Sequence, residues 1–174
     1  MITTFDLNVL RTVQELCAMH GVTGAYGVTI QDHMRAHLMK RREPSIGSIY
    51  ASLDKLETEG FVIASEGEAT AERHGKRKLY FTITEAGAKA IVADNIRHQE
   101  RLIARVKPVL AGNHPDIQGA VLAELLARFI AGTHPLLRET ILTVHIDMVR
   151  KLVPVCEAEL FQRGKPPGWD APPN

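Results

Sequence analysis

The sequence has few of the features that mark secreted, membrane or strongly basic proteins. Its 174 residues include two cysteines, one tryptophan and 5% aromatic residues, and the formal net charge is only +1. The two cysteines, Cys17 and Cys156, lie in apolar helical patterns with no spacing motif, which indicates reduced core residues. A net charge near zero excludes a general polycation, so any affinity for nucleic acid must come from local basic clusters.

Long apolar runs and catalytic motifs are also missing. No stretch reaches the roughly 18 apolar residues of a membrane span, and the opening MITTFDLNVL lacks the basic and apolar regions of a signal peptide. We therefore expect a cytoplasmic protein with no membrane partner. The chain has no phosphate loop, nucleophile elbow or paired-carboxylate motif, so we expect neither enzyme activity nor a cofactor.

One pair of histidines has a spacing that can hold a metal ion. His33 and His37 are four residues apart, but HMRAH has no acidic residue between them. A zinc site of this kind needs further ligands and usually such an acid. We therefore expect no metal site.

The residues that are present form helical patterns interrupted once by strands. Apolar spacings of three and four predict helices, and a polar loop at residues 69–75 separates two strand-like segments. The predicted elements, in chain order, are three helices, two strands and one long helix: residues 5–20, 28–40, 45–60, 61–68, 76–84 and 85–106. Three helices followed by a β-hairpin is the order of a winged helix-turn-helix domain. We therefore expect a mainly α fold with a small β-hairpin wing.

The third predicted helix, in PSIGSIYASLDKLETEG, has one apolar side and one side of small residues. The apolar side is expected to pack on the first two helices through Ile46, Ile49, Leu53 and Leu56. The other side is expected to carry Ser48, Ala51, Ser52 and Lys55, with Tyr50 beside them. Small side chains let a helix enter the major groove, and hydroxyl and ammonium groups bind phosphates or base edges. The alternative is an ordinary amphipathic helix with a solvated face.

Two basic clusters flank this helix. KRR at residues 40–42 precedes it, and ERHGKRK in the hairpin carries Arg73, Lys76, Arg77 and Lys78. A basic wing can lie along the DNA backbone or reach into the minor groove, where arginine is favoured. A single charge run is usually a solvated loop, but two runs around one bare helix favour DNA binding.

The same residues resemble the DNA-binding domain of PadR-type transcriptional regulators. In that family a helix beginning Ser/Pro-x-Gly-Thr/Ser-Leu/Ile-Tyr-x-x-Leu precedes a wing ending in Tyr-x-x-Thr-x-x-Gly. The matching positions here are Ser45, Gly47, Ser48, Ile49, Tyr50, Leu53, Leu56, Gly60, Tyr80, Thr84, Glu85 and Gly87. The resemblance covers roughly residues 5–95. It departs from the family at the second helix, where Ala25 replaces a common histidine and Val28 a common glutamate.

The resemblance implies a homodimer that binds an inverted repeat in double-stranded DNA and represses transcription, in many members under the control of a small ligand. It implies that the third helix and the wing contact DNA. With the basic cluster before that helix, the expected DNA-binding residues are Ser45, Gly47, Ser48, Tyr50, Ala51, Ser52, Lys55, Arg73, Lys76, Arg77, Lys78 and Arg42.

The second half of the chain has a different character. Wide apolar stripes predict helices over residues 117–132 and 136–161 that are buried against more than one neighbour, including a second subunit. We divide the chain into a DNA-binding domain (1–95), a helical dimerisation and effector region (96–163) and a disordered tail (164–174) with four prolines and two glycines. The alternative function is a winged-helix module that binds a protein partner in a larger assembly.

Overall fold

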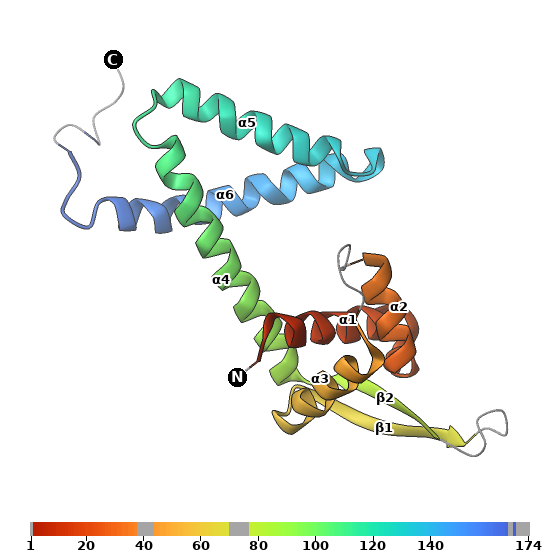
Figure 1. Ribbon diagram of the computed structural model, residues 1–174. Coiled ribbons are helices and arrows are strands. Elements are labelled where there is room, and N and C mark those ends of the chain that lie inside the picture. The colour runs from red at the N-terminus through yellow and green to blue at the C-terminus, as the bar shows by residue number, and fades with distance from the viewer. Residues whose placement is uncertain (1, 38–43, 70–76, 167–168, 170–174) are drawn as a thin grey trace. The chain divides into compact units, whose positions relative to one another are not determined.

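The computed structural model describes residues 2–37, 44–69, 77–166 and 169, and within them the chain follows the expected order of elements (Figure 1). The elements are α1 (Thr4–His20), the 3₁₀ turn η1 (Gly21–Thr23), α2 (Gly27–His37), α3 (Ile46–Thr58), β1 (Val62–Ala69), β2 (Arg77–Ile83), α4 (Glu85–Leu110), α5 (Pro115–Ala131), the 3₁₀ turn η3 (Pro135–Leu137) and α6 (Arg138–Leu160). The prediction of a mainly α fold with a β-hairpin wing is confirmed. The chain divides into two compact units, Met1–Lys107 and Pro108–Asn174.

Side-chain caps set where the helices of the first unit begin. Thr3 and Asp6 form a capping box at the start of α1, in which each side chain bonds the backbone N–H of the other residue. Ser45 caps α3 by accepting the backbone N–H of Ser48 at 3.1 Å. Gly60, which follows α3, has a φ of 77°, a conformation that glycine adopts at little cost.

The first unit encloses an apolar core built from all its helices and the hairpin. The buried side chains include Val9, Leu10, Val13, Ile30, Met34, Ile49, Leu53, Leu56, Val62, Phe81 and Ile91. The prediction that Ile49, Leu53 and Leu56 anchor the third helix is confirmed. The same prediction is wrong for Ile46, which is 39% exposed, because the buried stripe of α3 begins one turn later at Ile49.

The wing is an antiparallel hairpin that gains a third segment at one edge. Val62 pairs with Ile83 and Ser65 with Tyr80, and the register becomes irregular between Glu66 and Ala69. An isolated bridge joins Tyr26 to Tyr80. This bridge attaches the chain just ahead of α2 to the free edge of β2. Figure 1 shows α1, α2 and α3 gathered on one side of the hairpin.

The first turns of α4 are fastened to the first unit. A methyl group at Gly87 would overlap the backbone carbonyl oxygen of Phe61, so only glycine allows this close approach. One turn further, Ile91 is buried. Arg11 of α1 then donates 2.8 Å hydrogen bonds to the side chains of Asp94 and Asn95.

The second unit contains two long helices and no interior of its own. Figure 1 shows α5 and α6 running in opposite directions. Among the described residues, no side chain beyond Ile91 is buried. Large apolar side chains of both helices are about half exposed, among them Leu125 (55%), Phe129 (53%) and Met148 (51%). None of the helices in the described part of the chain is long and apolar enough to cross a membrane.

The two cysteines differ in their surroundings. Cys17 is partly buried, its Sγ donates to the carbonyl oxygen of Phe81 at 3.4 Å, and burial raises the pKa of its thiol. Cys156 is exposed on α6, so the prediction of a core residue is wrong for this cysteine in the single chain. The predicted disorder of the tail falls mostly on residues outside the described ranges. Within them, the ring of Trp169 lies 4.5 Å from that of Phe161.

Candidate nucleic-acid interface

The first turns of α3 present a small, polar and acid-free surface. Ser45, Gly47, Ser48 and Ala51 are all exposed, as predicted for the groove-facing side. The first turn contains no acidic residue. Backbone N–H groups at such a helix start carry partial positive charge and attract phosphate. This end of α3 can therefore approach an anionic polymer closely without steric or electrostatic conflict.

The expected exposure of Ser52 is wrong. Its side chain is 3% exposed, and its Oγ donates a 2.8 Å hydrogen bond to Oδ1 of Asp6 on α1. The physical reason is helical geometry, because positions 49, 52, 53 and 56 have the i, i+3, i+4, i+7 spacing of a single face. Ser52 thus belongs to the anchoring side of α3.

Lys55 also turns toward α1. Its Nζ lies 2.6 Å from Oδ2 of Asp6, and its side chain is 35% exposed. The expectation that Lys55 supplies charge to the exposed side of α3 is therefore not met in this structure, since its charge is neutralised by a carboxylate.

Asp6 is the residue that joins α1 to α3. Burial would raise the pKa of its carboxyl, but hydrogen bonds from Lys55, from Thr3 and from Ser52 outweigh that effect and lower the pKa from 3.8 to about 2. The carboxylate is only 5% exposed. Hydrogen bonds to a buried charge of this kind are stronger than those between neutral groups. The orientation of α3 therefore depends on an ionised Asp6.

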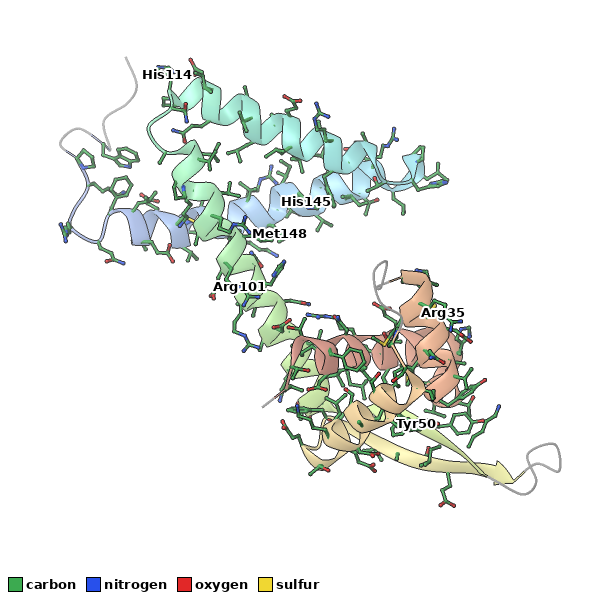
Figure 2. All side chains as sticks on the ribbon, viewed as in Figure 1. Arg35, Tyr50, Arg101, His114, His145 and Met148 are labelled. Atoms are coloured by element: carbon green, nitrogen blue, oxygen red, sulfur yellow. The ribbon has the colours of Figure 1, made fainter. Side chains whose placement is uncertain are left out.

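Tyr50, labelled in Figure 2, extends from α3 toward the beginning of α2. A Cβ atom added to Gly27, the first residue of α2, would lie 2.6 Å from both Cζ and Oη of Tyr50. The ring thus rests directly on the backbone at the start of α2 and remains 37% exposed. Its hydroxyl group is held where the first turns of α2 and α3 meet.

The wing residues are described only in part. Lys78 lies on β2 with its Nζ 4.5 Å from the ring centroid of Tyr26. The backbone of Arg77 begins β2. Arg42, Arg73 and Lys76 lie outside the described residues, so their expected role stays a prediction.

The histidine pair on α2 is engaged by another residue. Nε2 of His33 lies 2.8 Å from Oε2 of Glu15 on α1, and the rings of His33 and His37 are 4.5 Å apart. The residues that the structure describes contain no group of three or more histidine, cysteine, aspartate or glutamate side chains suited to a metal ion. His33 and Glu15 instead form a polar contact between α1 and α2.

Sequence reasoning missed three residues that shape this surface. Asp6 acts from a position far from α3 in the chain. Its three-residue spacing from Thr3, which is that of a capping box, is the local signal that could have marked it. Tyr26 and Gly27 lie between Ala25 and Val28, the two positions that depart from the family pattern. Nothing in the sequence indicated that Tyr50 covers Gly27 or that Lys78 lies over the Tyr26 ring.

Part of the first unit matches a known protein family. Residues 16–93 match the model of the transcriptional regulator PadR-like family, which confirms the resemblance noted in the sequence. No curated protein matches the chain.

Solved structures show more distant likenesses. Bacillus subtilis PadR in complex with operator DNA is 18% identical, with a TM-score of 0.46, and the match covers 99% of this chain and 85% of that one. A PadR family transcriptional regulator from Eggerthella lenta is 16% identical, with a TM-score of 0.39 and coverage of 63% and 92%. A transcriptional regulator from Thermoplasma acidophilum, itself described only as putative, is 23% identical, with a TM-score of 0.43 and coverage of 62% and 94%.

The substitution Asp6→Asn tests the joint between α1 and α3. Because the folded pKa of Asp6 lies below its ordinary value, the ionised carboxylate stabilises the folded protein above pH 4. This contribution to the free energy of unfolding is lost as the pH falls toward 2. We expect Asp6→Asn to lower the free energy of unfolding at pH 7 by on the order of 2 kcal/mol. Urea titrations between pH 3 and 7 should show a smaller dependence on pH in the variant. Asp54→Asn, at an exposed carboxylate on α3, is the control. A parallel loss of stability with acid in Asp6→Asn and wild type would contradict this role.

The substitution Gly27→Ala tests the contact with Tyr50. The new methyl group should push the Tyr50 ring outward, because the ring is the end of a side chain that can rotate into solvent. The expected result is loss of the nuclear Overhauser contacts between ring and helix start, with a stability change below about 1 kcal/mol. In a Tyr50→Ala background the same substitution should not lower the stability, since alanine is a better helix former than glycine. Equal costs in both backgrounds would show that the ring is not the cause.

Proposed function

Because residues 16–93 match the transcriptional regulator PadR-like family, we propose that the protein represses transcription by binding operator DNA as a homodimer. Members of this family are regulators and not enzymes. The observation that supports DNA reading is the first half of α3, which is fixed on its buried side and exposes Ser45, Gly47, Ser48 and Ala51. A winged-helix module that binds only protein is disfavoured by the family assignment.

We assign different roles to the two sides of α3. The backbone N–H groups at the start of α3 that the Ser45 cap leaves free, together with the hydroxyls of Ser45 and Ser48, would contact phosphate or base edges in the major groove, with Tyr50 at the edge of the contact. Ser52 and Lys55 hold the helix against Asp6 and set its angle. Lys78 and the basic residues predicted in the hairpin loop would bind the flanking backbone.

The second unit supports the proposal of a homodimer. An α-helical pair with no buried side chain lacks the apolar burial that stabilises folding. On α6, Ile141, Val144, Met148, Leu152 and Val155 follow one stripe, and Leu142, Ile146, Val149 and Val153 follow a second. One helix with two apolar stripes can pack on α5 of its own chain and on a partner as well. A second copy of the unit is the partner that we propose.

A small effector would also fit this unit. A hollow of about 440 Å³ lies between α5 and α6 and is lined by Ala127, Ile130, Leu142 and Arg138, among others. Its walls are mainly aliphatic and include Arg138, whose guanidinium donates to the carbonyl oxygens of Ala131 and Thr133. We propose a small, largely apolar molecule as the effector. We also place the protein in the cytoplasm, as expected for a regulator that binds operator DNA.

The substitution Ser48→Glu separates DNA binding from folding. Glutamate three residues after the Ser45 cap completes a capping box, so the stability of α3 should be kept or increased. The new carboxylate would repel phosphate. The affinity for a duplex containing the DNA upstream of the chain's own gene should therefore fall at least about 100-fold, which corresponds to a loss of about two to three kcal/mol of binding free energy. Fluorescence anisotropy measures this effect. Ser48→Gln, which keeps the capping geometry without the charge, is the matched control. Unchanged affinity in Ser48→Glu would refute the assignment of α3 as the DNA reader.

The substitution Met148→Glu tests the dimer. A carboxylate in the centre of the α6 stripe could not be buried against a partner without a large desolvation cost. Sedimentation should show a dimer for the wild type and a monomer for Met148→Glu. Thr143→Glu is the matched control, because 100° per residue places it on the polar side of the same helix. A wild type that sediments as a stable monomer would rule out the proposed interface.

A further inference from the structure

We propose that Tyr26 is a positioning residue for DNA binding, whose ring holds the Lys78 ammonium in place near the loop end of the wing for contact with a DNA phosphate. This inference rests on the proposed function and adds a residue that does not itself touch DNA. It concerns a short chain of contacts from β1 to β2 and on to the turn before α2.

The backbone fixes Tyr26 at the edge of the wing. The residue pairs with Tyr80 as an isolated bridge, and the neighbouring Ala25 accepts a 2.8 Å hydrogen bond from the backbone N–H of Phe81. On its other side, the N–H of Tyr26 donates to Oγ1 of Thr29 at 3.0 Å. Thr29 in turn donates to the carbonyl oxygen of Gly24 at 2.7 Å. The position of Tyr26 is thus determined by both β2 and the first turn of α2.

A second ring supports the first. The rings of Tyr26 and Tyr80 meet edge to face, with centroids 5.9 Å apart and planes at 86°, an arrangement that aromatic quadrupoles favour. Tyr80 has little freedom to move away, because its own ring covers Gly67 of β1. A Cβ atom at Gly67 would lie 2.5 Å from Cε2 of Tyr80. The glycine therefore allows the Tyr80 ring to lie across β1 and support Tyr26.

Lys78 occupies the face of the Tyr26 ring. Lys78 and Tyr80 are two residues apart on β2 and so project from the same face of the hairpin. The Lys78 Nζ lies 4.5 Å from the Tyr26 centroid, within the range of a cation–π contact. This contact orders the side chain without neutralising it, unlike the carboxylate of Asp6 that pairs with Lys55. Lys78 is thereby left ordered and charged, as a phosphate contact requires.

The ordering has a consequence for binding. A free lysine loses much rotamer entropy when it is held against a phosphate. The Tyr26 ring removes part of that loss before DNA arrives. Replacing the ring by an aliphatic side chain should therefore weaken the contribution of Lys78 while the lysine itself remains.

The test is a double-mutant cycle on the full-length protein. Affinities for the duplex containing the chain's own upstream region are measured at several salt concentrations for wild type, Lys78→Ala, Tyr26→Leu and the double variant. We expect Lys78→Ala to reduce the salt slope by about 0.9 per bound protomer, the value for one phosphate contact. Tyr26→Leu should weaken binding several-fold, and the double variant should bind no more weakly than Lys78→Ala. Independent, additive losses would overturn the inference.

Controls separate positioning from general damage. Tyr26→Phe keeps the aromatic ring and should bind DNA with wild-type affinity. Lys89→Ala, at an exposed lysine of α4, should leave both the affinity and the salt slope unchanged. If Tyr26→Leu does not fold, Tyr26→Met takes its place in the cycle. In the DNA-free protein, the ε-methylene protons of Lys78 should show an upfield ring-current shift that Tyr26→Phe retains and Tyr26→Leu loses. Absence of this shift in the wild type would also overturn the inference.

The same measurements distinguish failure of the proposed function from failure of the role given to Lys78 and Tyr26. A wild type that binds no duplex at low salt would refute both proposals. Normal wild-type binding together with an unchanged salt slope in Lys78→Ala would refute only the role of Lys78 and Tyr26.

Discussion

The buried carboxylate of Asp6 is the contact on which the orientation of α3 depends. It begins α1 through its capping box with Thr3 and holds the other helix through Ser52 and Lys55. One ionised group thus sets both the start of one helix and the angle of another. The exposed first turns of α3 can remain small and acid-free because the polar contacts that orient the helix lie on its buried side.

The other polar contacts of α1 follow the same plan. Arg11 reaches α4, Glu15 meets His33 of α2, and Cys17 donates to the carbonyl oxygen of Phe81 on β2. The apolar residues of α1 supply the burial, which is non-directional, and these side chains supply the direction. Each of the surrounding elements is therefore placed relative to a single helix, including the two that carry the proposed DNA contacts.

Local patterns in the sequence predicted most of the fold, but they did not predict contacts between residues that are distant in the chain. The apolar periodicities of α1 and α3 are local patterns, and so are the two strands and the polar loop of the hairpin. Ser52 was assigned to the wrong side because small polar residues were taken as exposed, although its spacing from Ile49 and Leu56 placed it on the anchoring face. The partner of that serine, Asp6, is 46 positions away, and no periodicity reports such a distance. The second unit could be predicted as helical, but its lack of a core required the structure.

The close contact between Gly27 and Tyr50 restricts how this surface can change during evolution. A larger residue at position 27 requires the ring at position 50 to leave, and a smaller residue at position 50 leaves the start of α2 uncovered. Substitutions at the two sites are therefore coupled, although one site lies on α2 and the other on α3. Related sequences should vary at these positions together, so that a change of recognition helix is accompanied by a change in the helix before it.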